Sequence, residues 1–116
     1  MPLIALETNK PLTVAQRAEL CEKLSRAAAE AIGKPEAYVQ AIIRPGEPAM
    51  RHGGADGPAA FVEVRSIGGL GKKANGELSK RVCALLEAAG IPGSRVYLNF
   101  VDVPAANWGH DGATFG

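Results

Sequence analysis

The order strand, helix, strand occurs twice along this chain, and both helices end in a glycine that is followed two residues later by a proline. The first helix is predicted to begin at Thr13, which forms a capping box with Gln16, and to end at segment 33–35. The second is predicted to end at segment 90–92, and both helices carry apolar residues at steps of three and four. We therefore predict one domain, 1–116, built from an internal repeat of residues 1–57 and 58–116.

Apolar runs predict strands at about residues 3–6, 38–44, 59–67 and 95–102. When a helix joins two parallel strands by a right-handed crossover, the helix packs against one face of their sheet. We therefore expect an α+β fold with α/β-like units, in which two helices cover one face of a four-stranded mixed sheet. The other face would carry apolar side chains such as Phe61, Tyr97 and Val101, so we expect another subunit to cover it in a symmetric oligomer.

Charge and cysteine content narrow the range of partners and locations. A net charge of +1, from 13 basic and 12 acidic residues without a basic block, does not indicate a nucleic-acid partner. Cys21 and Cys83 lack a paired spacing, so they are interpreted as small buried hydrophobes in a reducing compartment. The first apolar run is too short for a signal peptide or a membrane span. We expect a soluble cytoplasmic protein with no membrane contact. Release of the protein from the cell without a signal peptide stays open as an alternative.

Three kinds of catalytic or binding site fit the sequence poorly. Segment 69–74 has the spacing G-x-G-x-x-A, but a dinucleotide site needs an acidic residue about twenty residues on, at the end of the next strand. Asp102 is too far away for this role, which favours a glycine-rich turn. His52 and His110 have no partner at a metal-ligand spacing, and His52 is interpreted as a solvated histidine of the loop 46–58. A G-x-S-x-G nucleophile elbow does not occur in the sequence. We therefore expect no metal and no cofactor.

Pro2 directly follows the initiator methionine and precedes an apolar strand. Proline is tolerated at the first position of a strand, where its missing N–H costs no ladder bond, and this is the simplest interpretation. A small second residue also allows the methionine to be removed, which would leave a secondary amine at the end of a buried strand. Burial and a nearby lysine would both lower the pKa of that amine, and a neutral amine can act as a general base.

Short motifs occur in a fixed order along the chain: MP at the start, GKP at 33–35, SIG at 66–68, VYLNF at 96–100, and AAN and TF near the end. Together they resemble the macrophage migration inhibitory factor family of the tautomerase superfamily, over essentially the whole chain. The resemblance implies two β-α-β units per subunit and a homotrimer with active sites between subunits. These implications agree with the repeat and with the uncovered sheet face expected from the residues.

The resemblance also implies roles for residues near the chain start. Pro2 would be the catalytic base. Lys34 would meet the substrate carboxylate and help to keep Pro2 neutral. Ile67 would contact the substrate through its backbone, with Ser66 beside it.

Further pocket residues are implied by the same resemblance. Tyr97 and Asn99 would come from the neighbouring subunit, and their spacing places them on one face of a strand. The walls and rim would be formed by Tyr38, Trp108, His110 and Phe115. Trp108 stands in place of a smaller aliphatic residue and His110 in place of the family tryptophan, so the rim would be reshaped.

The implied activity is that of a cofactor-free keto–enol tautomerase, an isomerase acting on small aromatic α-keto acids of the phenylpyruvate kind. One alternative is a cytokine-like signalling or receptor-binding protein with a vestigial pocket. A second alternative, hydration of unsaturated acids, would need extra arginines in the pocket, and Arg65 is predicted on the strand face opposite to Ser66. The tautomerase mechanism also requires removal of Met1, because Pro2 would otherwise be an amide nitrogen without basicity.

Overall fold

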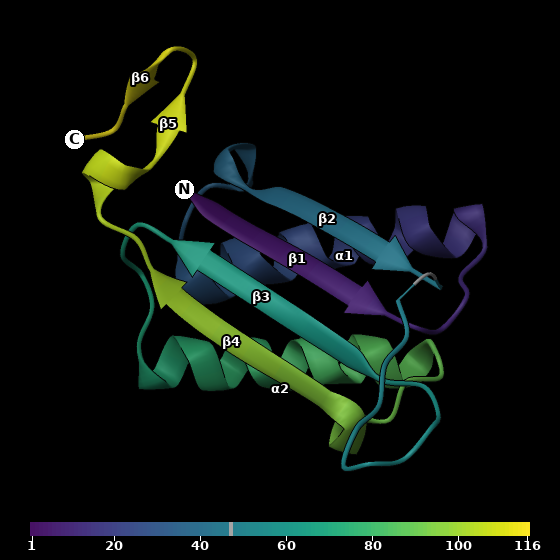
Figure 1. Cartoon of the computed structure of the whole chain (residues 1–116). Helices are drawn as coiled ribbons and strands as arrows, with labels where there is room; N and C mark the ends of the chain where they lie inside the picture. Colours follow the sequence, from purple (N-terminus) through teal and green to yellow (C-terminus); the bar gives the residue numbers. More distant parts are fainter. Residues whose placement is uncertain (47) are drawn as a thin grey trace.

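The computed structural model describes residues 1–46 and 48–116, in which two long helices lie on one face of a four-stranded sheet (Figure 1). The strands are β1 (Pro2–Thr8), β2 (Gln40–Pro45), β3 (Ala60–Ser66) and β4 (Val96–Asp102), and the helices are α1 (Val14–Ile32) and α2 (Lys72–Ala88). Short 3₁₀ turns are η1 (Glu36–Tyr38), η2 (Gly93–Arg95) and η3 (Ala105–Asn107), and the chain ends in a hairpin of β5 (Gly109–His110) and β6 (Ala113–Thr114).

The strand order of the sheet is β2-β1-β3-β4. β1 runs parallel to β2 and antiparallel to β3, and β3 runs parallel to β4, so the sheet is mixed. Each parallel pair is joined through a helix, α1 in the first case and α2 in the second. This architecture confirms the predicted fold class, while the repeat boundary between residues 57 and 58 stays a prediction. β2 and β4 begin slightly later than predicted, because 3₁₀ turns occupy residues 36–38 and 93–95.

Local hydrogen bonds set both ends of α1. The Gln16 N–H donates to Thr13 Oγ1 over 3.1 Å, and the Thr13 N–H donates to Gln16 Oε1 over 2.8 Å, which is the predicted capping box. At the other end Gly33 adopts the left-handed conformation, with φ of 77°, and its N–H donates to Ala29 O over 3.0 Å. Because the helix stops here, Lys34 lies at the turn that leads back to the sheet.

The core lies between the sheet and the two helices. In β1 and β3 every second residue is buried and faces the helices, as period-two alternation requires. The buried apolar side chains of these strands and of the helices include Ile4, Leu6, Leu24, Val62, Val64, Leu78, Val82 and Leu86. Within the described part of the chain, neither helix combines the length and the apolar character that crossing a membrane demands.

The opposite face of the sheet is not covered by any element of the described chain (Figure 1). Phe61 and Tyr97 are paired neighbours on this face, and their side chains are 38% and 68% exposed. Glu63 and Arg65 lie on the same face of β3 and form an ion pair. The uncovered face therefore combines large apolar side chains with a charged pair. The sequence predicted the apolar side chains but not the charged pair.

A C-terminal hairpin that the sequence analysis did not predict projects beyond the end of the sheet (Figure 1). Its strands have two residues each, and His110 pairs with Ala113 around Asp111 and Gly112. Both turn residues have positive φ, 47° at Asp111 and 84° at Gly112, as a type I′ turn requires. The Asp-Gly dipeptide was therefore the available signal for the hairpin. Strands of two residues are too short to show an alternation of apolar and polar residues.

Candidate active site

The start of β1 lies beside the end of β3, which in turn lies beside the end of β4. Pro2 pairs with Ser66, the last residue of β3, and Ser66 pairs with Asp102, the last residue of β4. The side chains of Pro2 and Ser66 are fully buried on the helix side of the sheet. The predicted base and the predicted Ser66 contact are thus neighbours at one end of the sheet.

The turn after β3 is fixed by hydrogen bonds at this same end. Ser66 Oγ donates to Gly68 O over 2.7 Å, and the Val103 N–H donates to Ser66 O over 2.9 Å. Asp102 Oδ1 accepts the Gly68 N–H over 3.1 Å. Ile67, which is half-buried, is therefore held between two anchored residues. Sequence reasoning did not identify Asp102 as a positioning residue, and its only signal was an acidic residue at the end of a predicted strand.

Lys34 reaches this end of the sheet from the C-terminus of α1. Its N–H donates to Ala29 O over 3.1 Å, and its side chain is half-buried. The glycine-rich turn lies against it, since a β-carbon on Gly69 would be only 3.5 Å from Lys34 Cε and 2.5 Å from Ile32 Cγ2. Gly69 therefore permits the turn after β3 to approach the end of α1.

The amino group at the chain start has a pKa lowered from its usual value. Burial is the larger cause, because it disfavours the charged form, and repulsion by the Lys34 ammonium adds to it. In this structure the amine belongs to Met1, which is half-buried next to Pro2. The start of β1 is thus an environment in which an amine tends toward its neutral form.

The predicted pocket walls lie at the same end of the molecule, in η1 and the C-terminal hairpin (Figure 1). Tyr38 in η1 is 55% exposed. In the hairpin the His110 and Phe115 rings stack with their centroids 5.8 Å apart, and the Phe115 N–H donates to Trp108 O over 3.1 Å. Trp108 is half-buried and His110 is exposed, so the side chains predicted for the pocket rim form an open group.

Within one chain, Tyr97 and Asn99 lie far from Pro2. Their register partners are Phe61 and Glu63 in β3, whereas the partner of Pro2 is Ser66. Measured along the strands from the level of Pro2 and Ser66, Asn99 therefore lies about 10 Å away and Tyr97 about 17 Å away, at about 3.3 Å per residue. β4 is also separated from β1 by β3. Both side chains are exposed, on the uncovered face.

His52 differs from its predicted environment. The sequence predicted a solvated loop histidine, but the side chain is half-buried and its ring centroid lies 4.7 Å from that of Tyr97. Neither the loop length nor the glycine content signalled this contact, because it joins residues far apart in the sequence.

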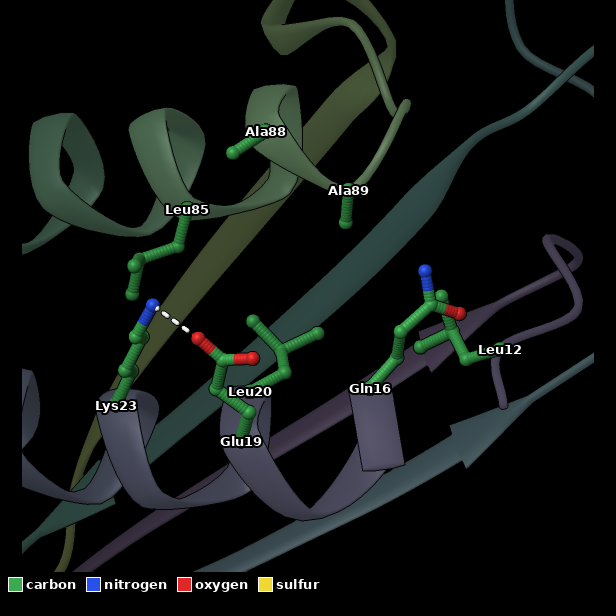
Figure 2. A pocket seen from close by; sticks show the side chains of 8 residues that line it. All are labelled: Leu12, Gln16, Glu19, Leu20, Lys23, Leu85, Ala88 and Ala89. Carbon is green, nitrogen blue, oxygen red and sulfur yellow. Dashed lines mark hydrogen bonds and ion pairs between the residues drawn. The ribbon is translucent and has the colours of Figure 1, made fainter. Parts of the chain in front are cut away.

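A hollow of about 180 Å³ lies elsewhere, between α1 and α2 (Figure 2). Leu20 and Leu85 line it from the two helices, and an ion pair of 2.7 Å between Lys23 and Glu19 stands at its edge. None of the predicted site residues lines this hollow. Across residues 1–46 and 48–116, no three His, Cys, Asp or Glu side chains gather as a metal site would require.

Comparison with known proteins agrees with the fold. Residues 1–116 match the family model described as Macrophage migration inhibitory factor (MIF). The chain belongs to the macrophage migration inhibitory factor family. It is 38% identical over 117 residues to the homolog from Brugia malayi, with 100% of each chain covered.

Two solved structures define the relationship further. The family homologue from Prochlorococcus marinus has 41% identity and a TM-score of 0.91, with 98% of this chain and 99% of that chain covered. A protein inactivated by 2-oxo-3-pentynoate has 26% identity and a TM-score of 0.83, with 97% and 94% covered. Membership places the chain in the tautomerase superfamily, and it supports isomerase-type activity on a small molecule and oligomeric assembly in general.

Proposed function

We propose that this protein is a cofactor-free keto–enol tautomerase of phenylpyruvate-type α-keto acids, with the secondary amine of Pro2 as general base after removal of Met1. The observation that carries the proposal is the environment of the chain start, where the buried Pro2 lies beside Ser66 and where burial and Lys34 lower the pKa of the Met1 amino group. A larger fraction of such an amine is neutral near pH 7, and only the neutral form can accept a proton.

In the proposed reaction the Pro2 nitrogen takes a proton from the carbon next to the substrate carbonyl. The electron pair of the broken C–H bond forms the C=C bond of the enolate, and the carbonyl oxygen receives the negative charge. Return of a proton to that oxygen gives the enol, and the reverse steps regenerate the ketone. No oxidant, reductant or second substrate is needed, because the reaction only moves one proton.

Lys34 supports the choice of a carboxylate-bearing substrate. Its ammonium lies close enough to the chain start to lower the pKa of the amine, so it can meet a substrate carboxylate beside the reacting carbon. The related protein that is inactivated by 2-oxo-3-pentynoate offers a second argument. That compound has the same 2-oxo-carboxylate group as phenylpyruvate. Ile67, between the anchored residues Ser66 and Gly68, is the proposed backbone contact of the substrate.

The proposed assembly is a homotrimer whose neighbouring subunit supplies Tyr97 and Asn99. Two observations support an intersubunit site. The register separates these residues from Pro2 of their own chain, and their side chains are exposed on an uncovered sheet face. Tyr38, Trp108, His110 and Phe115 would then complete the wall and rim of the pocket.

The proposal is tested with phenylpyruvate and the methionine-free protein, with Pro2→Ala assayed in parallel. Activity that depends on Pro2 is the expected result. Absence of phenylpyruvate turnover in both proteins would contradict the proposal and would favour a binding role for the same surface.

A further inference from the structure

Tyr97 is a large and mostly exposed side chain on the uncovered face of the sheet. It lies on the edge strand β4, and its paired neighbour on the open face is Phe61 of β3. A mostly exposed tyrosine in this position can populate several staggered χ1 rotamers. The aromatic contact that the structure gives Tyr97 is with His52, whose ring lies at 4.7 Å with a tilt of 45°.

Arg95 holds the loop that presents His52. Its guanidinium donates to four backbone carbonyls of this loop: Nε to Pro58 O at 2.7 Å, Nη2 to Ala55 O at 3.0 Å and to Gly57 O at 3.2 Å, and Nη1 to His52 O at 3.4 Å. His52 and Ala55 also exchange backbone hydrogen bonds of 3.1 Å and 3.0 Å. Since Arg95 directly precedes β4, the loop is attached to the strand that carries Tyr97.

We infer that His52 is a positioning residue, which holds the Tyr97 ring in the orientation that Tyr97 needs when it contributes to the active site of a neighbouring subunit. The inference rests on the proposed function, in which Tyr97 contacts the substrate. Segment 52–58 thereby becomes part of the intersubunit site, although Tyr97, which His52 contacts, lies far from Pro2 of its own chain.

The size of the effect follows from rotamer populations. Without the His52 ring, Tyr97 would distribute over about three χ1 wells, and equal populations would leave a competent fraction of about one third. Apparent affinity falls in proportion to that fraction, so the KM for phenylpyruvate is expected to rise by about threefold. The kcat should stay within about 1.5-fold, because the Pro2 environment does not change.

The experiment compares three variants of the methionine-free protein. His52→Ala should raise KM with little change in kcat, and His52→Phe should restore the wild-type KM because it keeps a ring against Tyr97. Asp56→Asn is the matched control, since it removes the 2.9 Å ion pair between Arg51 and Asp56 in the same loop without removing the His52 ring. An unchanged KM in His52→Ala, or an equal rise in Asp56→Asn, would overturn the inference.

A spectroscopic measurement reports on the ring contact independently of turnover. The chain contains two tyrosines, Tyr38 and Tyr97, so the ring signals of ¹³C-labelled tyrosine can be assigned with Tyr38→Phe. His52→Ala should shift the Tyr97 ring signals and leave those of Tyr38 in place. Unshifted Tyr97 signals would overturn the inference.

The two proposals fail in different ways. Turnover that is lost in Pro2→Ala but has the same KM in His52→Ala would remove the role of His52 and leave the proposed function intact. Full activity of Pro2→Ala would overturn the proposed base, while a raised KM in His52→Ala would still support the positioning role. Absence of any phenylpyruvate turnover would overturn both.

Discussion

Replacing Gly69 by alanine should loosen the turn that packs against Lys34. The structure indicates how much the free energy of unfolding should fall. Gly69 has a φ of 77°, a conformation that costs an L-residue about 1–2 kcal/mol. An added β-carbon would also lie 2.5 Å from Ile32 Cγ2 and 2.9 Å from Ile32 O. Ile32 is buried and cannot move freely, so overpacking adds about 1–3 kcal/mol. Gly69→Ala should therefore lower the free energy of unfolding by about 2–5 kcal/mol.

Gly68→Ala is the matched control for this variant. Gly68 has a similar φ of 71°, but a β-carbon there would meet no atom within 4 Å. It should lower the free energy of unfolding by the backbone cost alone, about 1–2 kcal/mol. Urea denaturation with linear extrapolation measures both values. If the two variants unfold within about 0.5 kcal/mol of each other, the close approach of Gly69 to Ile32 is not a constraint and the reasoning is refuted.

Two further predictions concern the two ends of β1. Lys34→Met removes a positive charge near the chain start, so the pKa of the amine should rise toward its usual value and a smaller neutral fraction should remain near neutral pH. The acid limb of the pH–rate profile should then move to higher pH, with a higher KM for phenylpyruvate, and an unmoved limb would contradict the role of Lys34. Thr8→Val removes a buried hydroxyl that donates to Ala59 O over 2.7 Å and accepts the Lys10 N–H over 3.1 Å, so it should cost about 1–3 kcal/mol of unfolding free energy. Denaturation measures this loss, and an unchanged free energy would show that these bonds add no net stability.

The boundaries of α1 could be predicted because their causes are local. The capping box of Thr13 and Gln16 and the left-handed Gly33 involve residues within one helical turn of each other, so a single sequence contains the whole signal. The alternation of buried residues in β3 is local in the same sense. These patterns were sufficient to predict the number of helices and the strands of the main sheet.

The site could be predicted only in part, because its contacts join distant segments. The strand register places Pro2 beside Ser66 and Ser66 beside Asp102, and no local pattern specifies that register. The roles of Lys34 and the aromatic walls came from the family resemblance rather than from periodicity. The same reason explains why the contact of His52 with Tyr97 was missed, since a loop at 46–58 reaches a strand that begins at residue 96.

The most direct test of the central claim is the kcat/KM for phenylpyruvate tautomerisation of the methionine-free protein, compared with that of Pro2→Ala. Alanine leaves a primary amine on a more flexible chain start, whereas proline supplies a secondary amine whose nitrogen is held in the pyrrolidine ring. Loss of a positioned general base is expected to lower the rate by about 10²- to 10⁴-fold, so we predict a loss of at least about 100-fold in the variant. Equal values of kcat/KM in the two proteins would contradict Pro2 as the base and leave proline with the structural role of beginning β1.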